Sequence, residues 1–362
     1  MCKEIGSNFW LDKHKKLEHK QIKLDYPGVE AIDTSFVSTG RSAISFVLNH
    51  IKIPENKKIA LLPPFTCHTV IEPFINAGYK VFFHHINKDL SCSREFFLRD
   101  IKRFKPALVL VHGYFGFNTL GPVADIISDI KEKGITVIED ITQTLYSEFR
   151  HIAADYYICS FRKWAALPDG GCAISAKTPF SYKPVKQDSK LQEAKLGAFH
   201  AKYLYINKGI GLKNKFLEQF REAEQILAGQ NSIFAMSEIS KVLQANLNID
   251  FIRGRRRKNF NVLAKGLINN DVVEPVFNTL DKETTPLYFP IYVKHDRKKI
   301  QDYLAGNNIY APIIWPRSSQ CEGLIDLNAE WIYQHILAIP CDQRYDNKDM
   351  ERIIKVLETY RN

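Results

Sequence analysis

The candidate catalytic pair is a carboxylate and a lysine, each placed just after a run of β-forming residues. The run Thr136 to Glu139 is followed by Asp140, and the run Tyr156 to Ser160 is followed by Lys163. Because ligands of open parallel sheets are met at the carboxyl ends of the strands, these positions are the first candidates for chemistry. A lysine in this apolar context loses solvation of its ammonium form, which favours a nucleophilic amine that forms a Schiff base with an aldehyde.

Asp140 would meet the second requirement of a site for pyridoxal phosphate (PLP). This cofactor needs a carboxylate on its pyridine nitrogen, because the protonated ring is the electron sink for the carbanion left when the substrate loses its α-proton. Taken alone, however, the two residues favour a simpler interpretation, in which Asp140 caps a loop and Lys163 is a surface lysine.

A phosphate cradle is predicted where Thr39 to Ser42 opens an apolar helix. Gly40, Arg41 and Ser42 offer unpaired backbone N–H groups at the positive end of the helix dipole, and Ser160 can add a hydroxyl. A glycine before a helix is common, so this signal is weak by itself. The motifs G-x-x-x-x-G-K-[ST] and G-x-G-x-x-G after a strand are missing from the sequence. Their absence argues against a P-loop NTPase and a nicotinamide dehydrogenase.

These residues require a mainly parallel sheet with helices on its faces. Between about residues 37 and 176, short β-rich runs alternate with amphipathic stretches, as such a sheet demands. The predicted strands are Lys58 to Leu62, Lys80 to His84, Ala107 to His112, Thr136 to Glu139, Tyr156 to Ser160 and Gly171 to Ser175. The predicted helices are Ser42 to His50, Thr69 to Ala77 and Pro122 to Gly134.

After Pro179 the pattern changes, which predicts a second part of the fold. We predict a polar helical region at Ser189 to Ala228, followed by a long amphipathic segment at Ser237 to Leu267. A smaller α+β unit comes after them. That unit is predicted to contain Tyr288 to Lys294 and His335 to Pro340 as extended runs, Ile313 to Pro316 as another, and helices at Arg297 to Asn307 and Asn347 to Tyr360. We therefore expect an N-terminal segment (1–30), a large α/β domain (31–228) and a small C-terminal α+β domain (229–362).

The composition is that of an ordinary globular protein. The 362 residues are 45% hydrophobic and 25% charged, with no apolar run long enough for a membrane helix and no secretory signal at the N-terminus. The seven cysteines are scattered without a C-x-x-C pair, so we expect reduced thiols and no metal site. The sequence thus predicts a cytoplasmic protein that does not bind membranes.

The net charge of +10 permits an anionic partner but does not choose one. The densest basic run, Arg253 to Lys258, lies in an apolar-periodic region. We interpret it as a solvated helix face and expect no nucleic-acid site.

Four blocks of sequence follow one another in a specific order. They are Thr39 to Ile44, Pro63 to His68 with Asn76 to Tyr79 behind it, Val137 to Gln143, and Ser160 to Trp164 with Pro168 to Gly171 behind it. In this order they resemble the DegT-type (DegT/DnrJ/StrS) family of PLP-dependent sugar aminotransferases, over nearly the whole chain. The four blocks reverse the preference for the simpler interpretation of Asp140 and Lys163.

The resemblance implies a fold and an activity. The fold would be that of PLP-dependent transferases of fold type I, which is aspartate-aminotransferase-like, in a homodimer. The activity would be transfer of an amino group from an amino acid, commonly glutamate, to a nucleotide-linked keto sugar, as in surface-polysaccharide or deoxyamino-sugar biosynthesis. Relatives that carry out dehydration have a histidine at the position of Lys163, so the lysine here favours transamination.

The resemblance also implies roles for single residues. Lys163 would be the Schiff-base lysine and general acid and base, Asp140 would pair with the pyridine nitrogen, and Gln143 would lie near the ring hydroxyl. The position that often stacks an aromatic group on the ring falls at Cys67 or His68, of which His68 is the better π-partner. A loop histidine without a role is the alternative for His68.

The phosphate is implied to bind at Ser160 and at the backbone of Gly40, Arg41 and Ser42. At position 41 a threonine is usual, so Arg41 would either add a charge to a phosphate or point to solvent. The lysine segment Ser160 to Lys163 is two residues shorter than the commoner form.

A further phosphate ligand of the family comes from the partner subunit. The family's asparagine for this role corresponds to Asn231 or, counted back from Met236 without a gap, to Ile233. Asn231 is our candidate.

Two other functions remain open on the sequence. The first is transamination of a different keto or aldehyde substrate that bears a carboxylate, for which Arg317 would be either the clamp or a plain surface arginine. The second is a non-catalytic PLP-binding regulator that uses its basic surface on DNA. Only ~30 residues precede the PLP-like part, which leaves no helix-turn-helix module in this sequence.

Overall fold

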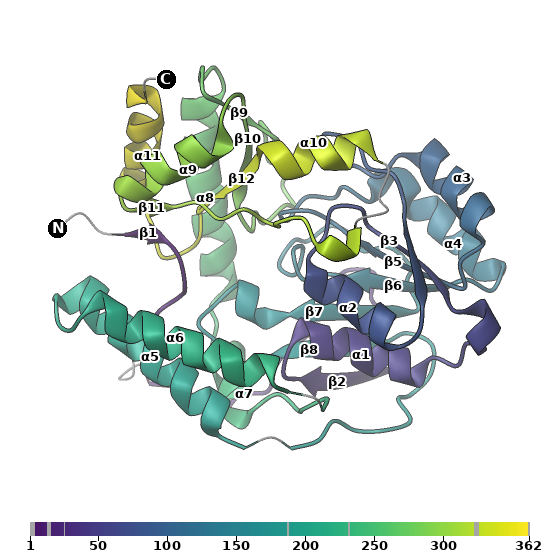
Figure 1. The fold of residues 1–362 in the computed structure, drawn as a ribbon. Coiled ribbons are helices and arrows are strands. Elements are labelled where there is room, and N and C mark those ends of the chain that lie inside the picture. The colour runs from purple at the N-terminus through teal and green to yellow at the C-terminus, as the bar shows by residue number, and fades with distance from the viewer. Residues whose placement is uncertain are drawn as a thin grey trace.

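A computed structural model describes residues 4–12, 16–24, 26–186, 188–230, 232–321 and 326–360. Its centre is a seven-stranded sheet in the order β2-β8-β7-β6-β5-β3-β4 (Figure 1). These strands are β2 (Asp33–Val37), β3 (Ile59–Leu62), β4 (Lys80–Phe83), β5 (Leu108–His112), β6 (Thr136–Asp140), β7 (Tyr156–Ser160) and β8 (Gly171–Ser175). Neighbouring strands from β4 to β7 are parallel, whereas β8 runs antiparallel to both β7 and β2. The six predicted strands are therefore confirmed, and β2 is the one that the sequence pattern missed.

Helices cover both faces of this sheet. Successive side chains of a strand point to opposite sides, so each strand packs against helices on both faces. Leu108 and Leu110 of β5 pack with the helices α1 (Gly40–His50) and α2 (His68–Asn76). Val109 and Val111 of the same strand pack with α3 (Arg94–Phe104) and α4 (Ala124–Glu132), the latter preceded by the short helix η2 (Gly121–Val123). The continuous apolar run of β5 is thus explained by burial on both faces.

The polar helical region after residue 189 is a helical hairpin. Its arms are α5 (Lys190–Lys208) and α6 (Lys213–Ala228), which pack against each other beside the sheet (Figure 1). The turn between them contains Gly209 and Gly211 with φ of 67° and 93°. Glycine adopts this left-handed conformation without the steric cost that a side chain would add.

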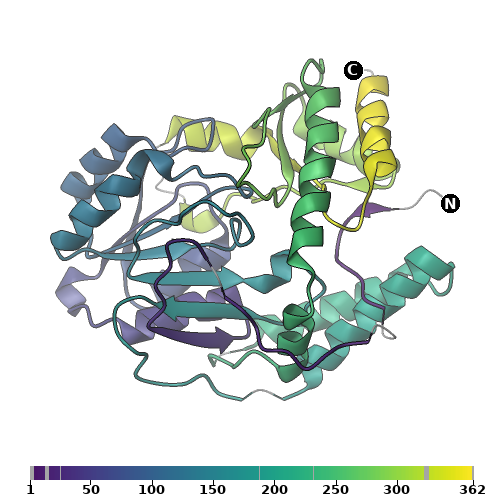
Figure 2. The ribbon, with the colours of Figure 1, turned by 180° about the vertical axis from the view of Figure 1, so that it is seen from behind.

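The long amphipathic segment predicted at Ser237 to Leu267 consists of two helices. α7 (Glu238–Ala245) ends before Asn248, whose side chain accepts from the Phe251 N–H at 2.9 Å and caps α8 (Ile249–Leu267). An asparagine favours a cap over a helix interior, because its side chain competes for backbone hydrogen bonds. Figure 2 shows α8 running from the large sheet to the C-terminal part of the fold.

The C-terminal part is a small antiparallel sheet with helices around it. Its strands, in the order β12-β10-β9, are β12 (Ile336–Ile339), β10 (Phe289–Val293) and β9 (Val273–Pro275). The helices are α9 (Arg297–Gly306), α10 (Leu327–His335) and α11 (Asn347–Thr359), of which α11 packs on α8. The predicted stretch Ile313 to Pro316 lies outside the sheets.

The N-terminal segment joins this C-terminal part through β1 (Ile5–Gly6), which pairs in parallel with β11 (Ile309–Tyr310). Leu243 of α7 packs in the core of the large sheet, although it follows residue 228. The division into 1–30, 31–228 and 229–362 stays a proposal.

No helix among the described residues is long and apolar enough to cross a membrane. Nor do the described ranges bring together three His, Cys, Asp or Glu side chains that could hold a metal ion.

Candidate active site

The site lies where the carboxyl ends of β5, β6 and β7 meet the N-terminal ends of α1 and α2. These ends surround a cavity of about 380 Å³. The lining side chains come from strand ends, helix starts and the end of α6: Thr39, Gly40, Arg41, Ile44, Thr66, Cys67, His68, Thr69, Val70, His112, Asp140, Thr142, Gln143, Ser160, Arg162, Lys163, Glu224, Leu227, Ala228 and Trp315. All the predicted site residues except Ser42 and Asn231 are in this set. Asn231 lies outside the described residues.

Asp140 ends β6 with its carboxyl group buried at 7% exposure. Burial raises its pKa from 3.8 to about 6, against the opposing effects of hydrogen bonds from Thr142 and of the Lys163 charge. The Thr142 N–H donates to this carboxyl at 2.9 Å. A desolvated carboxylate is stabilised by a cationic partner, and a protonated pyridine nitrogen is such a partner. Asp140 therefore fits the ring end of PLP.

Lys163 is the last residue of a short 3₁₀ helix, η3 (Phe161–Lys163), directly after β7. It lines the 380 Å³ cavity and also a second one, so the surface that it exposes is cavity surface. Burial in the cleft lowers the pKa of Lys163, and the neighbouring Arg162 guanidinium lowers it further. A larger fraction of the amine is therefore neutral and nucleophilic near pH 7 than for a solvated lysine.

Thr142 fixes the loops that carry the two groups relative to each other. Its hydroxyl accepts from the Ser160 N–H at 2.9 Å, and its carbonyl accepts from the indole N–H of Trp164 at 2.8 Å. The loop after β6 and the loop after β7 are thereby joined on both sides of Lys163. Thr142 was not predicted as a site residue, although Thr142 lies in the sequence block that ends at Gln143.

The residues predicted to cradle a phosphate lie at the start of α1. Gly40 and Arg41 are its first two residues, whose N–H groups have no acceptor one turn back in the helix. A side chain at Gly40 would put its Cβ 3.1 Å from the Cβ of Ser160, so glycine lets the helix start approach the end of β7. The Ser42 N–H already donates to the capping hydroxyl of Thr39 at 2.9 Å. We therefore assign the free donors to Gly40 and Arg41, rather than to all three residues.

The Arg41 side chain is partly buried and forms an ion pair. Its Nη1 lies 2.9 Å from the Glu72 carboxylate on α2. This pair balances the charge of Arg41 beside the cradle.

The remaining predicted residues, Gln143, Cys67 and His68, line the cavity but differ in their burial. Gln143 is buried, and its Oε1 accepts from the Phe115 N–H at 3.0 Å, which orients its amide. Cys67 precedes α2 and His68 begins it, with His68 exposed. The Cys67 Sγ accepts from the Thr69 hydroxyl at 3.1 Å.

His112 and Trp315 are cavity residues that we did not predict as site residues. Burial lowers the pKa of His112 to about 3, so its ring is neutral. The ring is held by Thr66 Oγ1 at 3.1 Å and lies edge-on to Trp315, with ring centres 5.7 Å apart. The position of His112 at the end of β5 was the available signal, whereas nothing local in the sequence places Trp315 here.

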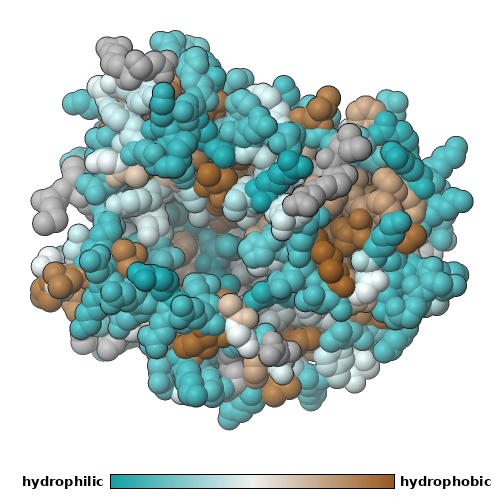
Figure 3. Space-filling view, in the orientation of Figure 1, coloured by the Kyte–Doolittle hydropathy of each residue, from teal (hydrophilic) through white to brown (hydrophobic). Residues whose placement is uncertain are grey.

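A second cavity of about 660 Å³ opens beside the first one and shares Arg162, Lys163 and Glu224 with it. Its other walls are the N-terminal segment, the α5–α6 hairpin and the C-terminal part of the fold. Figure 3 shows this face of the molecule hollowed between the hairpin and the C-terminal part, with mostly hydrophilic residues around the opening. Lys163 thus also faces this larger cavity.

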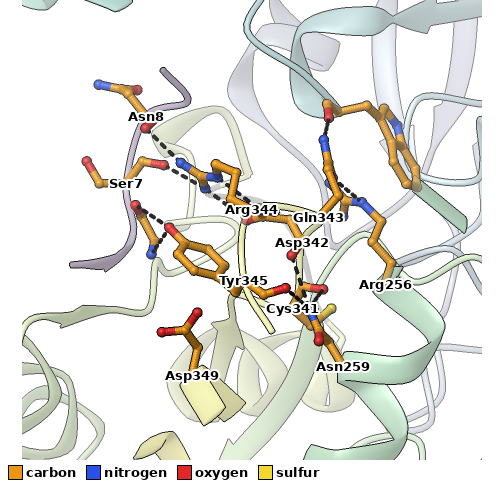
Figure 4. Close-up of polar contacts among 12 residues, drawn as sticks. Ser7, Asn8, Arg256, Asn259, Cys341, Asp342, Gln343, Arg344, Tyr345 and Asp349 are labelled. Carbon is orange, nitrogen blue, oxygen red and sulfur yellow. Dashed lines mark hydrogen bonds and ion pairs between the residues drawn. The ribbon is translucent and has the colours of Figure 1, made fainter. Parts of the chain in front are cut away.

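Trp164, the residue after Lys163, contacts Gln343 and Arg256 of the C-terminal part of the fold, which Figure 4 labels. Gln343 donates to the Trp164 carbonyl at 2.7 Å and accepts from Arg256 Nε at 2.9 Å. The Arg256 guanidinium lies over the Trp164 ring at 4.6 Å and donates to the Leu287 carbonyl at 2.7 Å. These contacts connect the lysine segment to α8 and to the small sheet.

The neighbouring Arg344 ties down the N-terminal segment (Figure 4). It forms two hydrogen bonds of 2.8 Å with Asp342 and donates to the carbonyls of Ser7 and Asn8 at 3.2 and 2.9 Å. The positive charge of Arg344 is thereby paired with the Asp342 carboxylate inside the protein.

The prediction of a solvated face for the basic run on α8 is wrong for three of its arginines. Arg253 donates to the Tyr146 carbonyl at 2.9 Å, Arg256 makes the contacts above, and Arg257 donates to the Thr284 carbonyl. Their periodicity is that of a helix packed between two sheets, and a sequence pattern does not reveal partners so distant in the chain.

The arginine considered as a clamp for a carboxylate substrate, Arg317, is engaged elsewhere. Its Nη1 lies 2.7 Å from Glu330, and it is not among the described residues that line either cavity.

Comparisons with known proteins agree with this geometry. The family model described as "DegT/DnrJ/EryC1/StrS aminotransferase family" matches residues 25–358. Among curated proteins, no sequence matches.

Solved structures share the fold at low sequence identity. Helicobacter pylori PseC is 16% identical with a TM-score of 0.70, over 98% of this chain and 98% of that chain. CalS13 from Micromonospora echinospora is 15% identical with a TM-score of 0.64, over 90% and 87%. DesV from S. venezuelae is 16% identical with a TM-score of 0.66, over 91% and 85%. Together with the family match, these likenesses confirm the predicted α/β fold of PLP-dependent transferases of fold type I.

Replacing Asp140 by asparagine should stabilise the cofactor-free protein at high pH. The folded-state pKa of Asp140 is raised from 3.8 to about 6, so its contribution to stability is full below pH 3.8 and is lost as the pH rises through 6. The two-unit shift corresponds to about 3 kcal/mol. Urea denaturation should therefore show Asp140→Asn more stable than wild type at pH 8, with the difference smaller at pH 5.5. An exposed control, Asp125→Asn, should not gain stability at pH 8, and a pH-independent gain for Asp140→Asn would contradict the burial argument.

Replacing Arg256 by leucine should destabilise the protein. The change keeps the apolar contact area but removes charge-assisted hydrogen bonds to Leu287 and Gln343, leaving their oxygens unpaired. We expect a loss on the order of 3 kcal/mol in the free energy of unfolding, measured by urea denaturation. The matched control on the same helix is the exposed Lys258→Leu, expected to change stability by less than about 0.5 kcal/mol. Equal effects of both variants would show that the network does not stabilise the fold.

Proposed function

Because the chain belongs to the DegT/DnrJ/EryC1/StrS aminotransferase family, it is a PLP-dependent aminotransferase, and we propose that its acceptor is a nucleotide-linked keto sugar. The proposed donor is glutamate. The observation that carries the proposal is a family match over residues 25–358 together with Asp140 and Lys163 in one cavity. Of the structures with this fold, CalS13 is described as a sugar aminotransferase and PseC as an aminotransferase involved in the biosynthesis of pseudoaminic acid. We propose a role in the same kind of pathway, surface-polysaccharide or deoxyamino-sugar biosynthesis.

The residues around the cavity fit the cofactor, and each has a proposed role. The carboxylate of Asp140 would hold the pyridine nitrogen, and Gln143 would lie near the ring hydroxyl. The Gly40 and Arg41 N–H groups with the Ser160 hydroxyl would hold the phosphate. His68 or Cys67 would cover one ring face, and Asn231 of a partner subunit would complete the phosphate site. We propose a cytoplasmic homodimer on this basis.

When bound, PLP supplies an electron sink for the carbanion formed at the substrate α-carbon. Lys163 would hold the cofactor until an amino acid enters and would then act through its free amine. The lowered pKa of Lys163 increases the neutral fraction of this amine, which would remove the α-proton of the bound amino acid, and its conjugate acid would return a proton. The Asp140 carboxylate would supply the negative charge for the ring nitrogen. Thr142 and Trp164 hold the loop so that Lys163 stays within the cavity.

The larger cavity supports a substrate bigger than an amino acid. It measures about 660 Å³ and combines aromatic side chains (Phe9, Phe199, Phe220, Tyr288 and Tyr310) with the guanidinium of Arg162, while the cation of Lys195 pairs with Glu224. Such walls suit a base and a diphosphate, since aromatic rings stack on bases and cations attract phosphates.

Replacing Lys163 by alanine should remove the covalent link and the base together. After borohydride reduction of the wild-type holoprotein, mass spectrometry should find the cofactor on a peptide that spans Phe161 to Trp164. Lys163→Ala should lack this label and lose turnover by at least about 10³-fold, because both roles of the amine disappear. Lys195→Ala, a lysine of the neighbouring cavity, should keep the label at position 163. A label elsewhere in wild type would refute the assignment.

Nucleoside diphosphates should compete with the acceptor. If the acceptor is a nucleotide-linked sugar, UDP or dTDP should raise the acceptor KM without changing kcat, because the free nucleotide fills part of the same cavity. Inorganic phosphate at the same concentration is the control. Absence of competition, together with turnover of a simple keto acid, would favour the carboxylate-bearing acceptor instead.

A further inference from the structure

Arg162 stands where the two cavities meet. It immediately precedes Lys163 in η3, and it lines both the 380 Å³ and the 660 Å³ cavity. Its Nε is buried and has no hydrogen-bond partner in the part of the chain that the structure describes. Within the same ranges, no carboxylate lies within ion-pair distance of it.

The carboxylates nearest to Arg162 are committed to other groups. Glu224, which raises the pKa of Arg162 through space, forms an ion pair with Lys195 across the α5–α6 hairpin. Asp169 accepts from Gln192 at 2.7 Å and from the Ser237 hydroxyl at 2.9 Å. The Arg162 Nε is therefore buried without a partner, no carboxylate among the described residues is in ion-pair contact with the guanidinium, and partial burial lowers its pKa. An incoming anion would offset that cost.

We propose that Arg162 binds the α-carboxylate of the amino donor. In an α-amino acid the carboxylate is bonded to the carbon whose proton Lys163 removes, so its binding group must lie beside Lys163. Arg162 is the neighbour of Lys163 in the chain and shares both cavities with it. The planar guanidinium offers two parallel N–H groups to a carboxylate, which fixes orientation as well as charge. This inference rests on the proposed use of an amino acid donor.

The phosphate of the cofactor is the other oxyanion that Arg162 could bind, and the layout favours the carboxylate. The proposed phosphate cradle at Gly40, Arg41 and Ser160 lines the smaller cavity alone, whereas Arg162 also lines the larger one. Arg162 is thus on the boundary through which a substrate enters. The Glu224 carboxylate at this boundary does not exclude an anion, because the Lys195 ammonium pairs with it.

The test compares Arg162→Gln and Arg162→Lys with a matched control, Arg317→Gln, whose side chain pairs with Glu330 away from both cavities. Three quantities are measured on each purified protein. They are PLP affinity from the absorbance of the bound cofactor, the glutamate concentration for half-maximal rate in the donor half-reaction, and the calorimetric Kd of the holoprotein for glutarate, an unreactive dicarboxylate.

We expect Arg162→Gln to raise the half-saturating glutamate concentration and the glutarate Kd by about 30-fold or more, with PLP affinity changed by less than about 3-fold. Arg162→Lys should lie between this variant and wild type, because it keeps the charge but not the planar fork. Arg317→Gln should match wild type. If Arg162→Gln does not fold, the lysine variant alone decides, since it must still weaken glutarate binding without weakening PLP.

Two results would overturn the proposal. A loss of PLP affinity with unchanged glutarate binding would assign Arg162 to the cofactor phosphate, and unchanged values of all three quantities would show that Arg162 binds no anion. The donor half-reaction needs no sugar, so failure of every nucleotide sugar as acceptor would reject the proposed acceptor and leave this inference standing. Failure of wild type to react with any amino acid, by contrast, would reject the proposed donor, and the carboxylate role would fall with it.

Discussion

The carboxylate of Asp140, buried at the end of a strand without a cationic side chain in ion-pair contact among the described residues, is the constraint on which this site depends. Its pKa of about 6 records the cost of that burial. Hydrogen bonds from the Thr142 N–H and hydroxyl and, at longer range, the Lys163 charge offset part of this cost. Such a group is useful when a cation arrives from outside, as a protonated pyridine ring does. Thr142 also accepts from the loop that carries Lys163, so the acid and the amine are positioned by one residue.

The approach of backbone segments around the cavity is set by glycines at two positions. Gly40 lets α1 begin against Ser160, and Gly171 lies where a Cβ would meet the Cys159 carbonyl at 2.6 Å. On the other side, Gln343 and Arg256 tie the segment after Lys163 to the small sheet. The cavity is thus closed by contacts between parts of the chain that are far apart in sequence. The segment around Lys163 is therefore positioned by contacts to both sheets, and not by the strand that precedes it alone.

Much of this arrangement could be predicted from the sequence. The six strands follow from short apolar runs. Asp140 and Lys163 are candidates because of their places at strand ends, and the four ordered blocks that resemble the family supply their expected roles. The edge strand β2 was missed because Asp33, Thr34 and Ser35 give it a polar pattern. The division of the amphipathic segment into two helices at Asn248 is not evident from the sequence, because the apolar period continues on both sides of it.

Other features depend on partners that no local pattern reveals. Arg256 reads as a surface cation until Gln343 and Leu287 are brought to it by the fold. The Ser42 N–H reads as a free donor until the rotamer of Thr39 is known. Trp315 enters the cavity from a segment with no regular structure to predict its direction. Charge and hydrogen-bonding capacity are visible in a sequence, but their use is decided by neighbours in space.

The central claim, that Asp140 holds a protonated cofactor ring in the cavity of Lys163, is tested most directly by ¹⁵N NMR of the protein reconstituted with PLP labelled at the pyridine nitrogen. The account predicts a protonated ring nitrogen at pH 8 in wild type and an unprotonated one in Asp140→Ala. An unprotonated nitrogen in wild type, or the same signal in both proteins, would contradict it.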